Sequence, residues 1–369
     1  MLLLSFSRHS HQRNFIPGFV AHPRTQIVAV ADSDDSIDDD LRHLNRRQAS
    51  ELGVPYVSGV PEALARDDVD IVSIAHDIER RAEFAQQAAA AGKHLWIDKF
   101  LGATLSECDA VVEAVAANNV RAIVPSYHYG SLVRQSLAAL GSGRLGDLLG
   151  VHVDVLFAKG WPRPSPEAAS HLPAQPEGRW KYAEVKRELL TVGAYAVGLL
   201  QSCLSQPRAV VAHGGARFFA EHAATGTEDF ATMTLTDASG RIGTLSGGRI
   251  GVASHPAGGP AIARLVGTRA TMTVDAKRPA MHTFLRDEIV HTNHHPDDND
   301  PMQWASGPAV LQPPLAADPA GLLAALDDFV DALDTDRRPA YSVEQARDNM
   351  RILLAGYHSM SADGAVVDL

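Results

Sequence analysis

The feature of this sequence that most constrains its fold is a series of short, largely apolar segments in the first 125 residues, separated by helical patterns. These segments are expected as strands, at residues 2–4, 27–32, 55–57, 69–75, 94–97 and 120–124. Strands that are apolar on both faces belong to a parallel sheet whose two faces are covered. Helices are expected between them, for example over about 38–52 and 105–117. With right-handed crossovers, this pattern predicts a doubly wound α/β domain.

The pattern changes after Pro125. Segments that partly alternate between apolar and polar residues follow at hairpin spacing, at 148–157, 209–218, 229–236, 241–247, 261–266 and 270–274. They predict a large, open, mainly antiparallel sheet. Residues 279–314 are expected to be loop-rich, and helices are expected at about 189–204, 322–334 and 343–360. We therefore expect a Rossmann domain over 1–125 and a substrate and oligomerisation α+β domain over 126–369, whose last helix is a candidate to pack back on the first domain.

Composition excludes several classes of function. The 369 residues carry a net charge of −11, which disfavours nucleic acid or an anionic membrane surface as a partner. Cys108 and Cys203 are far apart and lack metal-like spacing, so we expect no disulfide framework and a reducing, cytoplasmic compartment. The N-terminal apolar run is too short for a signal peptide, and no stretch approaches the roughly 18 apolar residues of a membrane span.

The turn after the first strand is where a dinucleotide pyrophosphate is expected. G-x-G-x-x-G is usual there, because glycines allow a tight turn and a close approach of the phosphates to the helix N-terminus. The same spacing here has serine at each glycine position, in Ser5-Phe6-Ser7-Arg8-His9-Ser10. The turn either binds the cofactor or is a polar turn that caps a helix, and these residues alone leave both interpretations open.

Asp32 ends the second expected strand, about 20 residues after Ser10. At this offset an acidic side chain accepts the ribose hydroxyls of NAD, although a strand-ending Asp is also common for other reasons. The following residues, Ser33-Asp34-Asp35, offer none of the Arg or Lys side chains that usually receive the extra phosphate of NADP. The pattern therefore predicts Asp32 and Ser33 at the adenosine ribose, and NAD in preference to NADP.

Two further strand ends are candidates for the same ligand crevice. Asp98 and Lys99 follow the strand at 94–97, and a lysine there can contact the nicotinamide ribose or the reacting oxygen. The alternative is a surface ion pair. Ala75 and His76, at the end of the strand over 69–75, are expected to line this crevice.

Several longer segments occur in an order that resembles a known family. They are "VAVADSDD", "DVDIVSIAHD", "AGKHLWIDKFLGATLSECDAVVEA", "SGRLGDLLGVHVD", "EDFATMTL" and the ending "LDDFVDALDTDRRPAYSVEQARDNMRILLAGYHS". Over nearly its whole length the chain resembles the glucose–fructose oxidoreductase / inositol dehydrogenase (GFO/IDH/MocA-type) family. The resemblance implies a Rossmann domain, an α/β domain with a large open sheet, and oligomers formed through that sheet. It also places the lysine of the family's E-K-P motif at Lys99.

The second catalytic motif of that family, G-G-G-x-x-x-D-x-G-x-H-x-x-D, is similar to residues 186–198 here. Gly193 is retained, whereas Thr191 stands at the Asp position and Tyr195 at the His position. Tyrosine there resembles the glucose–fructose oxidoreductase and dihydrodiol dehydrogenase branches, and a phenol can transfer a proton when an ammonium lowers its pKa. The resemblance thus implies Lys99, Tyr195 and Thr191 as catalytic residues. The alternative for Tyr195 is a half-buried helix aromatic.

The remaining candidates concern the substrate and metals. Tyr127 and His128 follow the last strand of the first domain and are substrate-binding candidates, although His128 could instead be a packed hinge residue. Lys181 lies where some family members have an arginine near the substrate. Metal-ligand residue types gather in one Pro- and Asp-rich loop, as His291, His294, His295, Asp297, Asp298 and Asp300. Without a helix or strand to preorganise them, we expect a solvated loop and no metal.

The expected function is hydride transfer between NAD and a small, polyhydroxylated sugar- or cyclitol-like alcohol or ketone, the substrate class being implied by the resemblance. A homo-oligomer, dimer or tetramer, is expected because an open sheet with apolar residues on its outer face needs covering. The departures from the family motifs keep two alternatives. One is a non-catalytic sensor or scaffold that binds dinucleotide or sugar, and the other is a lyase or isomerase that retains and recycles its NAD.

Overall fold

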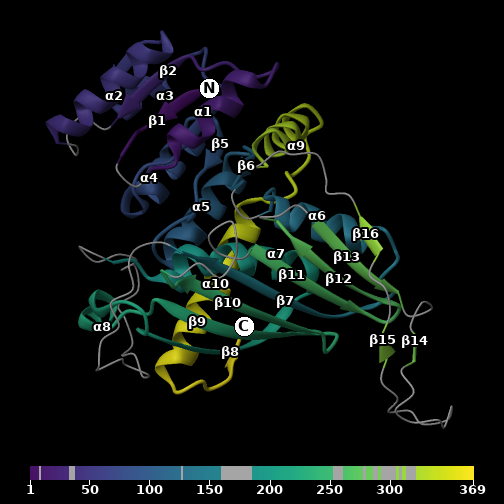
Figure 1. Cartoon of the computed structure of the whole chain (residues 1–369). Coiled ribbons are helices and arrows are strands. Elements are labelled where there is room, and N and C mark those ends of the chain that lie inside the picture. Colours follow the sequence, from purple (N-terminus) through teal and green to yellow (C-terminus); the bar gives the residue numbers. More distant parts are fainter. Residues whose placement is uncertain are drawn as a thin grey trace. The chain divides into compact units, whose positions relative to one another are not determined.

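The chain folds into two compact units (Figure 1). The computed structural model describes residues 1–7, 10–32, 38–125, 128–158, 185–251, 261–276, 280–285, 290–291, 305–306, 310–312 and 321–369. Of these, unit 1 contains 1–130 and 321–351, and unit 2 contains the residues between 131 and 312 together with 352–369. Unit 1 is therefore discontinuous in sequence, whereas the two predicted domains are contiguous.

Unit 1 is built on a parallel sheet of six strands in the order β3-β2-β1-β4-β5-β6. The strands are β1 (Leu2–Leu4), β2 (Ala29–Asp32), β3 (Tyr56–Ser58), β4 (Ile71–Ile74), β5 (His94–Ile97) and β6 (Ala122–Ile123). Every neighbouring pair is parallel, which confirms the predicted Rossmann sheet. The strand order reverses beside β1, so the carboxyl ends of β1 and β4 form the switch point at which sheets of this kind bind ligands.

Local signals in the sequence set the limits of the helices of unit 1. These helices are α1 (Gln12–Ala21), α2 (Asp39–Leu52), α3 (Val60–Leu64), α4 (Ile78–Ala90), α5 (Leu105–Ala117), α9 (Leu322–Asp334) and the first half of α10 (Val343–Ser361). Asp38 caps α2 by accepting the Leu41 N–H at 2.8 Å, and Thr104 and Glu107 form a capping box on α5. Gly92 follows α4 at φ +73°, the left-handed conformation in which glycine commonly ends a helix.

An aromatic cluster ties the C-terminal part of the chain to the sheet of unit 1. Trp96 on β5 is fully buried, and the rings of Phe15 and Phe19 on α1 meet it edge-on at 5.7 and 5.3 Å. Phe329 on α9 lies 6.2 Å from the same indole. This cluster explains why residues 321–351 belong with the first 130 residues.

Unit 2 contains a nine-stranded sheet in the order β16-β13-β12-β11-β7-β10-β9-β8-β17. Its strands are β7 (Leu148–Phe157), β8 (Pro207–Gly215), β9 (Phe230–Asp237), β10 (Ile242–Arg249), β11 (Ala261–Gly267), β12 (Ala270–Asp275), β13 (Ala280–Leu285), β16 (Val310–Gln312) and β17 (Val367–Asp368). The β7–β10 pair is parallel, and the other neighbours are antiparallel. The predicted open, mainly antiparallel sheet is confirmed.

Helices cover one face of this sheet (Figure 1). They are α6 (Ser131–Gly141), a π-helical turn η1 (Leu189–Gly193), α7 (Ala194–Cys203) and the second half of α10, while the short α8 (Ala220–Thr225) precedes β9. On β7 the side chains of Val151, Val153 and Val155 alternate toward this face and are buried. The alternation has the period of two that identified the strand in the sequence.

The opposite face of the sheet differs from the expectation of an apolar surface. Its central strands carry polar side chains, which are exposed or half-buried: Thr232, Thr234, Thr244, Ser246, His152 and Asp154. His152 Nδ1 lies 2.7 Å from Thr244 Oγ1 on the neighbouring parallel strand. Ile242 is 47% exposed on the same face, so the expected apolar outer surface is present only in part, and the oligomer stays a prediction.

The stretch predicted as loop-rich, 279–314, also contains regular structure. β13 pairs along its full length with β12, β16 adds a further strand, and β14 (Val290–His291) pairs with β15 (Ala305–Ser306). The prediction was wrong for these segments because Pro, Asp and His between them dominate the local composition. Five of the residues in the Pro- and Asp-rich loop that was expected to be solvated and to hold no metal lie outside the described residues: His294, His295, Asp297, Asp298 and Asp300.

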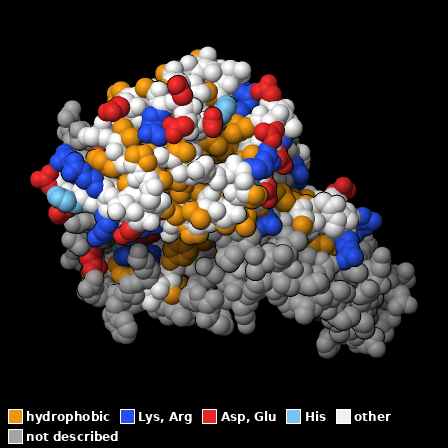
Figure 2. All heavy atoms as spheres, turned by 90° about the horizontal axis from the view of Figure 1, so that it is seen from above, with side chains coloured by type: hydrophobic (Ala, Val, Ile, Leu, Met, Phe, Trp, Pro, Cys, Tyr) orange, Lys and Arg blue, Asp and Glu red, His pale blue; other side chains and the backbone are white. Residues whose placement is uncertain are grey.

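The described surface shows mixed charge. On the face seen in Figure 2, acidic and basic side chains are interspersed among apolar ones. Within the described residues, no helix combines the length and the apolar content needed to cross a bilayer.

A substitution at Gly321 can test how the start of α9 packs in unit 1. This glycine adopts φ +63° before α9, and a Cβ there would lie 1.6 Å from the carbonyl oxygen of Tyr129. Gly321→Ala should therefore lower the free energy of unfolding by about 3 kcal/mol or more, because it adds a backbone collision to an unfavourable φ. Gly53→Ala is the matched control: Gly53 has φ +69° but open space around it, so only about 1 kcal/mol should be lost. Equal losses in urea denaturation would contradict the packing described for Tyr129.

Candidate functional site

The carboxyl ends of three neighbouring strands bring predicted site residues of unit 1 to one edge of the sheet. Ser5 and Ser7 follow β1, Ala75 and His76 follow β4, and Asp98 and Lys99 follow β5. The hydroxyl of Ser7 donates to Asp77 Oδ1 at 2.7 Å, which joins the ends of β1 and β4 directly. Five other predicted site residues lie outside the described residues: Arg8, His9, Ser33, Tyr127 and Lys181.

The serine-containing turn is held by a residue of α2. Asn45 is fully buried; its Oδ1 accepts the N–H of Phe6 at 2.8 Å, and its Nδ2 donates to the Phe6 carbonyl at 3.2 Å. Ser10 Oγ accepts the N–H of Gln12 at 3.0 Å, at the start of α1. Ser10 thus has the helix-capping role that the sequence left open, and cofactor binding by this turn stays a prediction.

Asp32 lies at the carboxyl end of β2 and is fully buried. The hydroxyl of Tyr56, on the adjacent β3, donates to Asp32 Oδ1 at 2.7 Å. This bond fixes the orientation of the carboxylate at the position where the sequence predicts the ribose contact. Sequence analysis missed Tyr56, although its place on the strand after Asp32 is the signal that could have identified it.

Asp98 is a buried carboxylate with several partners. Its Oδ1 accepts the N–H of Lys99 at 2.8 Å and lies 3.1 Å from Nδ1 of His11 on α1. Burial alone would raise the pKa of Asp98, but the hydrogen bond to His11 and the positive charge of Arg81 outweigh it and hold this pKa below its usual value. Asp98 therefore stays ionised, and the expectation of a surface pair with Lys99 does not describe it.

Arg81 is the buried cation that organises this edge. Its guanidinium donates to the carbonyl of His76 at 2.8 and 3.2 Å, to that of Phe100 at 2.6 Å and to that of Asp98 at 3.3 Å. It also lies 3.5 Å from Asp98 Oδ2. One side chain thus connects the ends of β4 and β5 on both sides of Lys99. The signal in the sequence is a lone cation on the apolar face of α4, three residues after Ile78.

The side chains of Lys99 and His76 each lie beside a phenylalanine ring. Lys99 is followed by a cis peptide bond to Phe100, and its Nζ lies 4.9 Å from the centre of the Phe100 ring. His76 is buried, which lowers its pKa, and its ring lies 5.0 Å from that of Phe84. The imidazole of His76 is therefore neutral at pH 7.

His128 packs against aromatic residues of unit 1. Its ring stacks on Tyr341, with centres 5.7 Å apart and planes at 25°, and meets Tyr129 edge-on at 5.1 Å. Burial lowers its pKa. This environment supports the packed-histidine interpretation, while a contact with substrate stays a prediction.

The second catalytic motif lies in unit 2, on η1 and α7. Gly193 packs tightly on β10, since a Cβ on Gly247 would lie 3.1 Å from the Cα of Gly193. Thr191 and Tyr195 are both half-buried, and the hydroxyl of Thr191 donates to Glu188 Oε2 at 2.8 Å. Sequence analysis did not identify Glu188 as part of this group.

Two distant residues cap the first turn of the motif. Glu228 Oε1 accepts the N–H of Leu189 at 2.9 Å and the hydroxyl of Tyr357 at 2.6 Å. The same Tyr357 oxygen accepts the N–H of Leu190 at 3.1 Å, and the guanidinium of Arg187 lies 3.7 Å from its ring centre. The motif helix thus begins on tertiary contacts, which no local pattern in the sequence could reveal.

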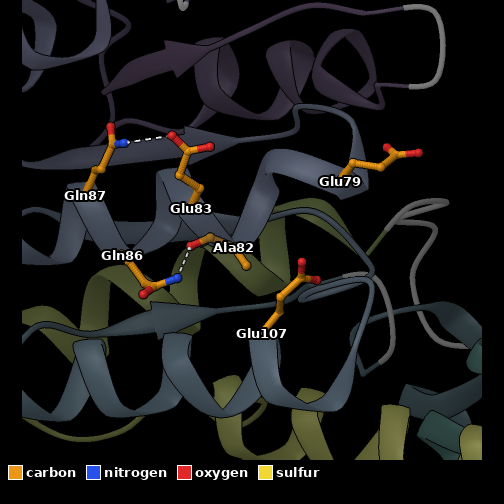
Figure 3. A pocket seen from close by; sticks show the side chains of 6 residues that line it. All are labelled: Glu79, Ala82, Glu83, Gln86, Gln87 and Glu107. Carbon is orange, nitrogen blue, oxygen red and sulfur yellow. Dashed lines mark hydrogen bonds between the residues drawn. The ribbon is translucent and has the colours of Figure 1, made fainter. Parts of the chain in front are cut away.

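A pocket of about 320 Å³ lies apart from these groups, between α4 and α5 (Figure 3). Its lining comprises Glu79, Ala82, Glu83, Gln86, Gln87 and Glu107. Three carboxylates make it unsuitable for the phosphates of a dinucleotide, and Glu107 already belongs to the capping box of α5. Among the described residues, no group of three or more His, Cys, Asp or Glu side chains is arranged to hold a metal ion.

Comparison with known proteins identifies the family. The model of the oxidoreductase family with an NAD-binding Rossmann fold matches residues 9–126, and that of the GFO/IDH/MocA C-terminal domain matches residues 133–273. The chain belongs to the GFO/IDH/MocA oxidoreductase family. It is an NAD(P)-dependent oxidoreductase, with an NAD-binding Rossmann domain followed by a second α/β domain.

Individual relatives are distant. An uncharacterised oxidoreductase of Streptococcus pneumoniae serotype 4 is 24% identical over 171 residues, which are 46% of this chain and 45% of that protein. The aldose–aldose oxidoreductase of Caulobacter crescentus, solved with glycerol, has a TM-score of 0.73 at 18% identity, covering 100% of this chain and 98% of the other. A levoglucosan dehydrogenase, solved with NADH and levoglucosan, has a TM-score of 0.74 at 17% identity, with the same coverage. At these identities the solved structures show a shared fold.

Arg81 provides a test of the network at the strand ends. Arg81→Met should lower the free energy of unfolding by about 3 kcal/mol or more, because it removes the buried charge beside Asp98 and the donors to three carbonyls. Arg80→Met is the matched control: Arg80 is a half-buried neighbour that pairs with Glu83 and lies over the Phe84 ring, and its loss should cost about 1 kcal/mol. Urea denaturation measures both. Similar midpoints for the two variants would show that Arg81 does not organise this edge.

Proposed function

We propose that the chain is an NAD-dependent dehydrogenase that transfers a hydride between the nicotinamide and a sugar- or cyclitol-like alcohol or ketone. The observation that carries the proposal is the placement of Asp98 and Lys99 at the carboxyl end of β5, beside the switch point of a parallel sheet in a family that binds NAD. The ionised Asp98 and the buried Arg81 hold the backbone on both sides of Lys99. A fixed lysine at this edge can orient a substrate oxygen.

The described residues fit the cofactor at the ribose end. The carboxylate of Asp32, oriented by Tyr56, would accept the adenosine ribose hydroxyls. Ser5, Ser7 and Ser10, with Arg8 and His9, would lie along the pyrophosphate, Ser33 near the ribose, and Ala75 and His76 beside the nicotinamide half. When bound, the nicotinamide ring supplies or accepts the hydride.

Proton transfer is assigned to the side chains of this chain. We assign to the Tyr195 phenol the transfer of a proton to or from the substrate oxygen, and to the Lys99 ammonium the lowering of the phenol pKa and the orientation of that oxygen. Thr191 lies one helical turn before Tyr195, on the same face. Tyr127, His128 and Lys181 are the proposed contacts to the rest of the substrate.

A polyhydroxylated substrate is supported by the relatives. Two proteins of the same fold were solved with glycerol and with levoglucosan. We also propose a homo-oligomer, dimer or tetramer, in the cytoplasm. Cys108 and Cys203 are free and buried, and burial raises the pKa of each thiol to about 12, as suits cysteines that remain reduced.

Cofactor preference is the first test. Isothermal titration with NADH and NADPH should give a dissociation constant for NADH at least about tenfold lower, roughly 1.4 kcal/mol. Asp32 would face the extra phosphate of NADPH, and two like charges in a partly desolvated site repel. Asp32→Ser should shrink the preference, chiefly by weakening NADH, whereas Asp68→Ser, at an exposed carboxylate paired with Arg66, should leave it unchanged. Equal dissociation constants in the unmodified protein would show that Asp32 does not meet the ribose.

Turnover of aldoses and cyclitols with NAD is the second test. Lys99→Ala and Tyr195→Phe should each lower turnover about 100-fold, the scale of a general acid–base group. The double variant should lose much less than the product of the two effects, because groups that act as a unit are not additive. Lys93→Ala is the control; Lys93 donates to the carbonyl of Arg66 before β5 begins, and activity should stay within about twofold of the unmodified protein.

The outcomes of the turnover test separate the alternatives. Full activity of Tyr195→Phe would reject its assignment as proton donor. Cofactor binding without turnover of any compound would favour a sensor or scaffold. Product formation without net reduction of NAD would favour a lyase or isomerase with recycled cofactor.

A further inference from the structure

Glu188 is a buried carboxylate at the start of the motif helix that the assigned chemistry does not use. Its side chain is 8% exposed, and its Oε2 accepts the Thr191 hydroxyl. Two nitrogen-bearing side chains flank its other oxygen: Nε2 of His222, on α8, lies 3.7 Å from Oε1, and Nε of Arg249, at the end of β10, lies 3.8 Å from it. These groups all belong to unit 2.

The neighbouring carboxylates show what a structural role requires here. Asp229 accepts the N–H groups of residues 217–219 at 2.7 to 3.0 Å, and Glu228 accepts the N–H of Leu189. Both carboxylates therefore stabilise the backbone. Within the described residues, the Glu188 carboxylate instead contacts side chains, and the nearest nitrogens of His222 and Arg249 lie beyond hydrogen-bond distance.

His222 is the second observation. Its side chain has no exposed surface, and neither ring nitrogen has a hydrogen-bond partner within the described residues. A buried polar group without a partner costs about 1–3 kcal/mol. Such groups are rare in folded proteins and are found where a ligand or a function requires them. Nε2 of this ring lies 3.7 Å from Oε1 of Glu188, so the unsatisfied imidazole and the buried carboxylate belong to one cluster.

The hydrogen bond from Thr191 places this carboxylate next to a residue of the proposed catalytic motif. Glu188 lies directly before η1 and Thr191 lies within it, so both belong to the first turn of the motif helix. Thr191 thus carries no charge, but its hydroxyl orients the carboxylate of Glu188 three residues earlier.

We propose that Glu188 and Arg249 form a binding site for two adjacent hydroxyl groups of the polyhydroxylated substrate, with Thr191 and His222 positioning the carboxylate. This inference rests on the proposed function. The carboxylate accepts a hydrogen bond from one hydroxyl, and the guanidinium donates to the oxygen of the next. Acceptor and donor side by side match adjacent hydroxyl groups and discriminate against a compound that lacks one of them, since a buried group is then left unpaired.

The test compares complete and deoxygenated substrates. Glucose, myo-inositol and their monodeoxy analogues are assayed with NAD, and kcat and KM are measured for the unmodified protein and for Glu188→Gln. The variant should lose roughly 10- to 100-fold in kcat/KM, the range of a charge-assisted hydrogen bond. It should also become indifferent to removal of the hydroxyl that Glu188 binds, whereas the unmodified protein should lose a similar factor on that analogue. The dissociation constant for NADH should not change.

The controls separate the possible failures. Glu344→Gln, on α10 in unit 1, should match the unmodified protein on every analogue. Should Glu188→Gln not fold, Thr191→Val and Arg249→Lys are put through the same series and should show the same indifference. If the unmodified protein turns over none of the compounds, the proposed function fails. If it is active and the variants keep its full selectivity among the analogues, the proposed site at Glu188 is refuted while the function stands.

Discussion

The buried pair of Asp98 and Arg81 is the interaction on which the carboxyl edge of the sheet in unit 1 depends. Removing two charges from water costs several kcal/mol per ion, and attraction between them offsets this only when additional hydrogen bonds satisfy both groups. Both conditions are met here, because His11 and the Lys99 N–H serve the carboxylate while three carbonyls serve the guanidinium. A network of this kind has one low-energy arrangement, so the strand ends that it joins are fixed in that arrangement.

In unit 2, the backbone N–H groups at the start of the motif helix are satisfied by side chains distant in sequence. The N-terminus of η1 has no side-chain cap of its own, and its first N–H groups would be unsatisfied without Glu228 and Tyr357. Burial raises the pKa of Glu228, against the hydrogen bond from Tyr357 and the charge of Arg187. The conformation of the motif helix therefore depends on Glu228, which lies just before β9, and on Tyr357 of α10, so packing of these segments and orientation of Thr191 and Tyr195 are coupled.

The sequence predicted those parts of the fold that local physics decides. Continuous apolar strands identified the parallel sheet, and Gly92 marked the end of a helix because few other residues adopt its backbone conformation. What it missed depends on partners distant in sequence. Arg81 is recognisable only once the carbonyls of His76 and Phe100 surround it, and β13 only once β12 lies beside it. Glu188 was missed because the family motif specifies no residue type at position 188, whereas it specifies one at the position of Thr191.

The serines that replace glycines in the first turn form hydrogen bonds within the protein. Glycine is usual at such a turn because it allows a close approach of phosphate to the backbone. Here the Ser7 hydroxyl donates to Asp77, that of Ser5 to the Phe6 carbonyl at 3.4 Å, and Ser10 accepts from the first turn of α1. These side chains hold the turn rather than extend from it, and Asn45 fixes its backbone from α2. The hydroxyl hydrogens of Ser5 and Ser7 are thus already engaged within the protein, whereas Ser10 engages its oxygen. The hydroxyls of Ser5 and Ser7 therefore do not replace the glycine backbone as phosphate donors, and the N-terminus of α1 with its backbone N–H groups is the part of the glycine motif that its replacement by serine leaves in place.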